Sequence, residues 1–214
     1  MSVYDEQPSF AIDAAMGEAY RTDLEAVLGS LSTYQQVLDL GAGTGIFTAF
    51  LAPWVSTIMG VDRAAESLAH AQHRVPAGQF AVADLESPGI ATHCGAPTVR
   101  FDLVTARYVI HELADPIATF TAWKPLLAPG GHLVLIENCW QRTDWGWSDW
   151  GKRSDHLPLA CTQTWATAVY CVQAAGLQVT AARWMQTVNR LEQMHLMTGF
   201  RLYVIVATMA TDSD

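Results

Sequence analysis

The sequence predicts an α/β fold in which a mostly parallel, doubly wound sheet carries helices on both faces. Two observations lead to this prediction. Short apolar runs of strand length alternate along the chain with segments of helical periodicity, which is typical of repeated strand–helix–strand units. A glycine-rich turn from Gly41 to Gly45 directly follows the first of these runs, as expected where a strand bends sharply into a helix.

The first half of the chain supplies three strands and three helices. Residues 10–30 place apolar side chains at helical spacing, so we expect a helix there. Val37–Leu40 predicts a short buried strand, and the following helix, Thr44–Ala52, ends before Pro53 because proline does not continue a helix. The alternation then continues with strand Ser56–Val61, helix Arg63–Arg74 and strand Gln79–Ala83.

The second half resumes the pattern after a loop, Glu86–Arg100, that is rich in Gly, Pro and Thr. The expected elements are strand Phe101–Thr105, helix Asp115–Leu127, strand His132–Glu137 and helix Thr164–Ala175. Two final apolar segments, Leu177–Val188 and Phe200–Ala207, are interpreted as strands joined by a longer loop. Because no full helix separates them, we expect an antiparallel hairpin that closes the sheet.

The length of 214 residues is that of one domain, so residues 1–214 are assigned to a single unit. Two parts fall outside the alternation. Residues 1–32 predict an N-terminal helical cap, and residues 138–162 predict a tryptophan-rich insert or lid between the fifth strand and the next helix.

Composition restricts the possible partners. Lysine and arginine number 12 against 21 acidic residues, the formal charge is −9, and no basic run is present, so we expect no nucleic-acid partner. No uncharged apolar stretch reaches the roughly 18 residues of a membrane span. Four cysteines without a C-x-x-C pair indicate reduced thiols in the cytoplasm and predict no metal site.

The glycine turn indicates a cofactor site, because ligands of open α/β sheets bind beyond the carboxyl ends of the strands. A dinucleotide fingerprint needs a third glycine where Ile46 stands. Asp39 ends the strand just before the turn, and its carboxylate would repel a pyrophosphate but stabilise an ammonium group. These residues favour S-adenosylmethionine, whose amino-acid end is cationic and which has no phosphate, over NAD.

Two further acids follow neighbouring strands. Asp62 closes the second strand, where a carboxylate can accept hydrogen bonds from both ribose hydroxyls of a nucleoside. NAD sites use an acid in the same way, so Asp62 alone does not separate the two cofactors. Asp84 follows the third strand and can accept a hydrogen bond from an adenine amino group, although an aspartate there is also a common helix cap.

From about residue 35 to 137 the chain resembles the class I S-adenosylmethionine-dependent methyltransferases. The resemblance rests on five motifs in order: VLDLGAGTG at 37–45, GVD at 60–62, AD at 83–84, FDLV at 101–104 and LAPGGHL at 127–133. It implies a Rossmann-like sheet of seven strands with the last strand antiparallel. The residues expected to bind the cofactor are Tyr20, Asp39, Gly41, Gly43, Gly45, Asp62, Arg63, Asp84, Leu85 and Arg107.

Residues past the fourth strand are the catalytic candidates, because in the resembling family this stretch lies beside the methyl donor. His111 has an ordinary pKa near 6.5, suitable for a general base at neutral pH, and a packing role is the alternative. Tyr108 is the second candidate. Arg107 can also bind an acidic group of the substrate.

The tryptophan-rich segment is the expected substrate wall, through stacking and cation–π contacts. Its residues are Trp140, Trp145, Trp147 and Trp150, followed by His156 as a further acid/base candidate. Structural packing of these rings on the domain is the alternative.

The function expected from the sequence is methyl transfer from S-adenosylmethionine to oxygen, nitrogen or sulfur of a small, partly apolar metabolite. There are three alternatives. The first is an enzyme that binds S-adenosylmethionine but performs non-methyl chemistry, for example a cyclase. The second is an NAD-linked oxidoreductase, and the third is a non-catalytic binding subunit.

Overall fold

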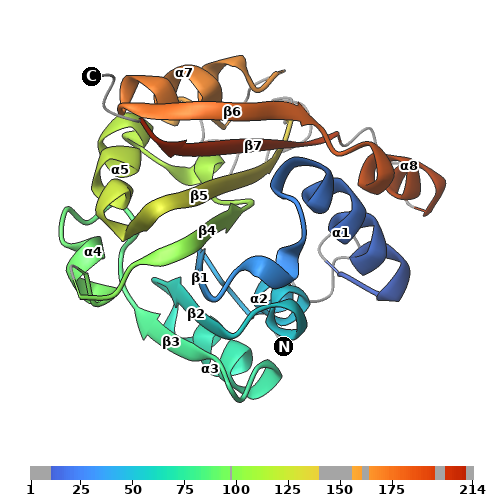
Figure 1. The fold of residues 1–214 in the computed structure, drawn as a ribbon, viewed down its shortest axis with the longest axis horizontal. Helices are drawn as coiled ribbons and strands as arrows, with labels where there is room; N and C mark the ends of the chain where they lie inside the picture. Colours follow the sequence, from blue (N-terminus) through green and yellow to red (C-terminus); the bar gives the residue numbers. More distant parts are fainter. Residues whose placement is uncertain (1–10, 97, 140–155, 161–163, 196–200, 211–214) are drawn as a thin grey trace.

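The computed structural model describes residues 11–96, 98–139, 156–160, 164–195 and 201–210. Its centre is a seven-stranded sheet with the order β3-β2-β1-β4-β5-β7-β6 (Figure 1). Strands β1 to β5 pair in parallel, whereas β7 is antiparallel to both of its neighbours. The predicted mostly parallel sheet with an antiparallel C-terminal hairpin is therefore confirmed.

The amino-terminal half follows the predicted alternation. Its regular elements are α1 (Ala14–Leu28), β1 (Gln36–Leu40), α2 (Ile46–Leu51), β2 (Thr57–Asp62), α3 (Ala65–Arg74), β3 (Gln79–Val82) and α4 (Ile90–His93). Helix α1 begins at a side-chain cap, because Asp13 accepts a hydrogen bond from the Met16 amide at 2.8 Å. The short helix α4 lies within the segment predicted as a loop.

The second half contains the other four strands. Its elements are β4 (Phe101–Arg107), the 3₁₀ helix η4 (Ile110–Glu112), α5 (Pro116–Trp123), β5 (Leu127–Asn138), α7 (Ala166–Ala174), β6 (Leu177–Trp184), α8 (Gln186–His195) and β7 (Leu202–Met209). Asp115 caps α5 by accepting a hydrogen bond from the Ala118 amide at 3.0 Å, and Pro116 opens the helix.

One prediction is wrong at the end of the chain. Leu177–Val188 was expected to be a strand followed by a loop, but the strand ends at Trp184 and helix α8 begins at Gln186. Val188 packs in the core with α1 and α2, and Asp23 of α1 accepts hydrogen bonds from the amides of Thr187 and Val188. These hydrogen bonds from α1 satisfy the first backbone amides of α8, which have no partner within the helix. The local sequence around Gln186 does not predict this contact.

Both faces of the sheet are covered, as Figure 1 shows for α5 and α7 on one side and α1 and α8 on the other. The alternation of strand side chains divides the core accordingly. On β7, Tyr203 and Ile205 pack with α5 and α7, whereas Val204 and Val206 pack with α1, α2 and α8. The parallel strands all end at one edge, and the chain reverses its order between β1 and β4, which makes this carboxyl edge the place for a ligand.

Candidate active site

The turn between β1 and α2 needs glycine for two different reasons. Gly41, Gly43 and Gly45 all have positive φ angles, of 73°, 53° and 79°. A Cβ at Gly45 would lie 2.8 Å from Ala71 Cα, and one at Gly41 would overlap Val109, so these two positions are closed by packing. In front of Gly43 the nearest atom is a backbone oxygen at 4.0 Å, which leaves open space at the centre of the turn.

Asp62 holds this turn in place from the end of β2. Its carboxylate accepts hydrogen bonds from the Gly43 amide at 2.9 Å and from the Ala64 amide at 2.8 Å. The side chain is half-buried, so it joins the turn to the start of α3 while part of it faces solvent. The structure thus brings the expected ribose acid and the expected glycine turn together.

Asp39 lies beneath the turn, where it is 1% exposed. Its carboxylate accepts hydrogen bonds from the hydroxyls of Thr48 at 2.6 Å and Thr105 at 2.9 Å. Burial raises the pKa of Asp39 to about 6, although these two hydrogen bonds and the charge of Arg107 oppose the increase. A cation at this position would stabilise the ionised form of Asp39. The two threonines are site residues that the sequence analysis missed.

The other cofactor candidates lie along the same edge. Asp84 is exposed just after β3 and accepts a hydrogen bond from the Glu86 amide at 3.1 Å, while Leu85 beside it is half-buried. Arg63 is exposed after β2 and pairs with Glu112 of η4 at 3.1 Å. This ion pair lies across the edge, between the segments that follow β2 and β4.

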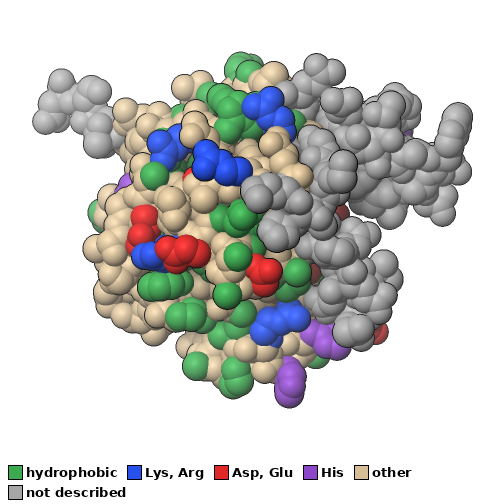
Figure 2. Space-filling model, turned by 90° about the vertical axis from the view of Figure 1, so that its right-hand side faces the viewer, with side chains coloured by type: hydrophobic (Ala, Val, Ile, Leu, Met, Phe, Trp, Pro, Cys, Tyr) green, Lys and Arg blue, Asp and Glu red, His purple; other side chains and the backbone are tan. Residues whose placement is uncertain are grey.

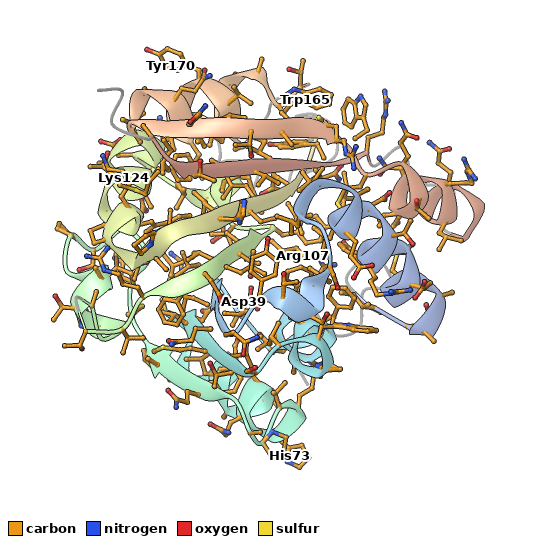
Figure 3. All side chains as sticks on the ribbon, viewed as in Figure 1. Asp39, His73, Arg107, Lys124, Trp165 and Tyr170 are labelled. Carbon is orange, nitrogen blue, oxygen red and sulfur yellow. The ribbon has the colours of Figure 1, made fainter. Side chains whose placement is uncertain are left out.

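Arg107, at the end of β4 (Figure 3), contacts two tyrosines, of which Tyr20 of α1 is buried, whereas Tyr108 and Arg107 itself are half-buried. Arg107 Nε donates a hydrogen bond to the Tyr20 hydroxyl at 3.0 Å, and its guanidinium lies 4.5 Å from the ring centroid of Tyr108. Tyr108 has a φ of 56°, a strained value for a residue other than glycine. Burial raises the pKa of both phenols, so Tyr108 is suited to donate a hydrogen bond and not to act as a base.

His111 is paired with an acid that the sequence analysis did not select. Its Nδ1 lies 2.7 Å from Glu137 Oε2, and both side chains are buried. Burial lowers the pKa of His111, but the charge of Glu137 and the hydrogen bond to it outweigh burial, and the pKa is raised overall. Glu137 Oε1 also accepts the Asn138 amide at 2.9 Å, which fixes the carboxylate.

This pair has the arrangement of an oriented base. The carboxylate of Glu137 holds one ring nitrogen of His111, which orients the imidazole and favours one tautomer. The sequence signal for Glu137 was its place as an acidic residue at the end of the apolar strand β5. Parallel strands end at the same edge of the sheet, so this position could have been predicted to lie near the site. That signal does not identify the partner, since the contact joins residues 26 positions apart.

Only one residue of the predicted substrate wall lies within the described residues. Trp140, Trp145, Trp147 and Trp150 lie outside the described residues. His156 is described, and its side chain is exposed. Within the described ranges, no three His, Cys, Asp or Glu side chains are grouped to hold a metal ion. In the same part of the chain, no helix has the length and apolarity needed to cross a membrane.

Comparison with known families gives one match over most of the chain. Residues 12–182 match the model of a methyltransferase domain. Among curated proteins, a ubiquinone biosynthesis O-methyltransferase from Leptothrix cholodnii is 33% identical over 113 residues, covering 52% of this chain and 47% of that protein. The chain thus aligns with about half the length of this relative.

Solved structures share the fold at lower identity. The N-methyltransferase NodS from Bradyrhizobium japonicum, in complex with S-adenosyl-L-homocysteine, is 18% identical with a TM-score of 0.62, covering 97% of this chain and 90% of NodS. Geranyl diphosphate C-methyltransferase from Streptomyces coelicolor, in complex with Mg²⁺, geranyl diphosphate and S-adenosyl-L-homocysteine, is 15% identical with a TM-score of 0.63, covering 90% of this chain and 77% of that one.

Proposed function

The chain belongs to the methyltransferase domain family, and from this premise we propose that it transfers the methyl group of S-adenosylmethionine to oxygen, nitrogen or sulfur of a small, partly apolar metabolite. The observation that carries the proposal is the open turn at Gly43 beside the Asp62 carboxylate, at the carboxyl edge of the sheet. Membership in this family also favours S-adenosylmethionine over NAD, the other cofactor considered from the sequence.

The residues present fit this cofactor by their chemistry. Asp62 offers carboxylate oxygens for ribose hydroxyls, and Asp84 is exposed at the next strand end for an adenine amino group. Buried Asp39 is suited to a nearby ammonium group, because a cation offsets the cost of ionising a carboxyl whose pKa burial has raised. Open space at Gly43 lets a ligand approach the backbone of the turn.

When bound, S-adenosylmethionine supplies an electrophilic methyl group on a sulfonium, and the protein aligns the acceptor and excludes water. We assign His111 the role of accepting a proton from a hydroxyl, thiol or protonated amine acceptor, with Glu137 as a positioning residue that stabilises the imidazolium. Tyr108, whose ring contacts the Arg107 guanidinium, is assigned as a hydrogen-bond donor.

A titration with a matched variant tests cofactor binding. We expect Gly43→Ala to weaken the binding of S-adenosylmethionine at least tenfold in isothermal titration, because the added methyl group enters the open space of the turn. Gly130→Ala is the control, since Gly130 also has a positive φ, of 75°, with nothing within 4 Å, but lies exposed near the start of β5, outside the site. Tight binding of NAD by the unaltered protein, or equal effects of both variants, would count against the proposal.

The pairing of His111 with Glu137 predicts a pH effect. A general base must be neutral, so kcat rises with pH through the pKa of His111, which the Glu137 charge raises. We expect Glu137→Gln to move the midpoint of the kcat–pH profile about one unit toward acid. Glu112→Gln, which alters a more exposed acid with a smaller effect on His111, is expected to move it less. A midpoint that does not move in Glu137→Gln would remove this role.

A further inference from the structure

A hollow of about 350 Å³ lies beside the end of strand β6 and helix α8, separate from the turn that we assign to the cofactor. Its described lining consists of Trp184, Gln186, Asn189, Arg190, Gln193 and Arg201. Figure 2 views the molecule from the side on which α1 and α8 lie, and Lys and Arg side chains gather in the upper part of this face.

The hollow is tied directly to the proposed catalytic pair. Strand β7 begins where β5 ends, with Leu202 opposite Asn138. The Arg201 amide donates a hydrogen bond to Asn138 Oδ1 at 2.7 Å, and the Asn138 amide in turn donates to Glu137 Oε1. The hollow and the His111–Glu137 pair therefore share the carboxyl edge of the sheet, where an acceptor has to lie.

One wall of the hollow is held rigidly. Asn189 of α8 is buried, and its amide group donates to the Leu202 carbonyl at 2.9 Å and accepts from the Leu202 amide at 2.7 Å. These two bonds fix α8 against the start of β7. Arg190 lies on this helix and Arg201 directly precedes the strand, so the two arginines belong to elements that keep their relative position.

The hollow is cationic although the whole chain carries a formal charge of −9. Two arginines line it, and its described lining includes no acidic residue. Glu192, the acidic residue of helix α8, is buried. Burial raises the pKa of Tyr20 and of Tyr108, and the negative charge of Glu192 raises both further. Glu192 is therefore near these tyrosines, on the α1 side of the helix. Two arginines at one hollow favour an anion, because each guanidinium can bind it through paired N–H donors.

Trp184 adds an apolar surface to this charge. The guanidinium of Arg201 lies 4.1 Å from the centroid of the Trp184 ring system, in a cation–π contact. Trp184 is half-buried and packs edge-to-face with Trp165, at 4.6 Å between ring centroids. An unsaturated part of a ligand can contact the accessible part of the indole, beside the Arg201 guanidinium, while its acidic end binds the arginines.

From this arrangement we infer that the methyl acceptor carries an acidic group, a carboxylate or a phosphate, which binds Arg190 and Arg201 with an adjoining unsaturated part against Trp184. This inference rests on the proposed function for the statement that the ligand is the acceptor. The binding of an unsaturated acid in the hollow is independent of methyl transfer and can be measured without it.

Isothermal titration with three probes of similar size tests the inference: trans-cinnamate, phenyl phosphate and the neutral cinnamyl alcohol. We expect the two acids to bind at least tenfold more tightly than the alcohol, and the tighter acid indicates whether the natural group is a carboxylate or a phosphate. Arg190→Gln and Arg201→Gln are each expected to weaken the binding of the two acidic probes at least tenfold. The control is Arg183→Gln, because Arg183 is equally exposed on β6 but its side chain alternates to the other face from Trp184.

The possible outcomes separate this inference from the proposed function. Equal binding of acids and alcohol, or equal losses in Arg183→Gln and the two lining variants, overturns the hollow as an acid site. If the acids bind as expected but the protein does not bind S-adenosylmethionine, the proposed function fails and the hollow remains. If the protein methylates neutral acceptors as rapidly as their acidic analogues, the assignment of the hollow to the acceptor fails.

Discussion

Replacing His111 by alanine is expected to lower kcat by at least about 100-fold, the usual contribution of a positioned general base. The affinity for S-adenosylmethionine should change by less than about threefold, because the imidazole is held by Glu137 and not by the glycine turn. Single-turnover kinetics with a hydroxyl acceptor, together with isothermal titration of the cofactor, measures both quantities on one preparation.

The matched control is His132→Gln on the same strand as Glu137. His132 lies toward the opposite end of β5, where its ring nitrogen is 3.2 Å from the Tyr34 hydroxyl. Its loss removes a histidine hydrogen bond of similar kind far from the carboxyl edge, so kcat should stay close to that of the unaltered protein. Wild-type turnover in His111→Ala would show that the histidine is a packing residue.

Replacing Asp62 by alanine is expected to weaken the binding of S-adenosylmethionine at least tenfold. Two effects add, because the variant loses the proposed acceptor of the ribose hydroxyls and also the carboxylate that holds the Gly43 and Ala64 amides. The expected result is a higher Kd in titration, with the loss of kcat at saturating cofactor much smaller than the loss of affinity.

Asp102→Ala separates the two effects. Asp102 also accepts hydrogen bonds from two backbone amides, those of Gln35 and Gln36, but at the opposite edge of the sheet. We expect similar losses of unfolding free energy in both variants, measured by urea denaturation, and a change of cofactor affinity only in Asp62→Ala. An unchanged affinity in Asp62→Ala would refute the ribose role.

Much of this architecture is readable from local patterns. Strand β1 is an apolar run that stops at glycines. Few structures other than a buried strand fit a short apolar run that is followed by a turn with positive φ angles. Helix α8 is the counterexample, because its first amides are satisfied by Asp23, more than 160 residues away. A segment whose stabilising partner is so distant carries no local signal of its own.

Local sequence patterns account for the order of the strands and of most helices, and for the edge at which the polar ends of the strands meet. Those properties follow from periodicity and from glycine, which act over a few residues. The contact of Glu137 with His111, and the placement of Arg190 and Arg201 at one hollow, come from the packing of distant segments. Each of these contacts joins side chains from different elements, and their meeting depends on how the sheet twists and the helices pack, which no short stretch of residues encodes.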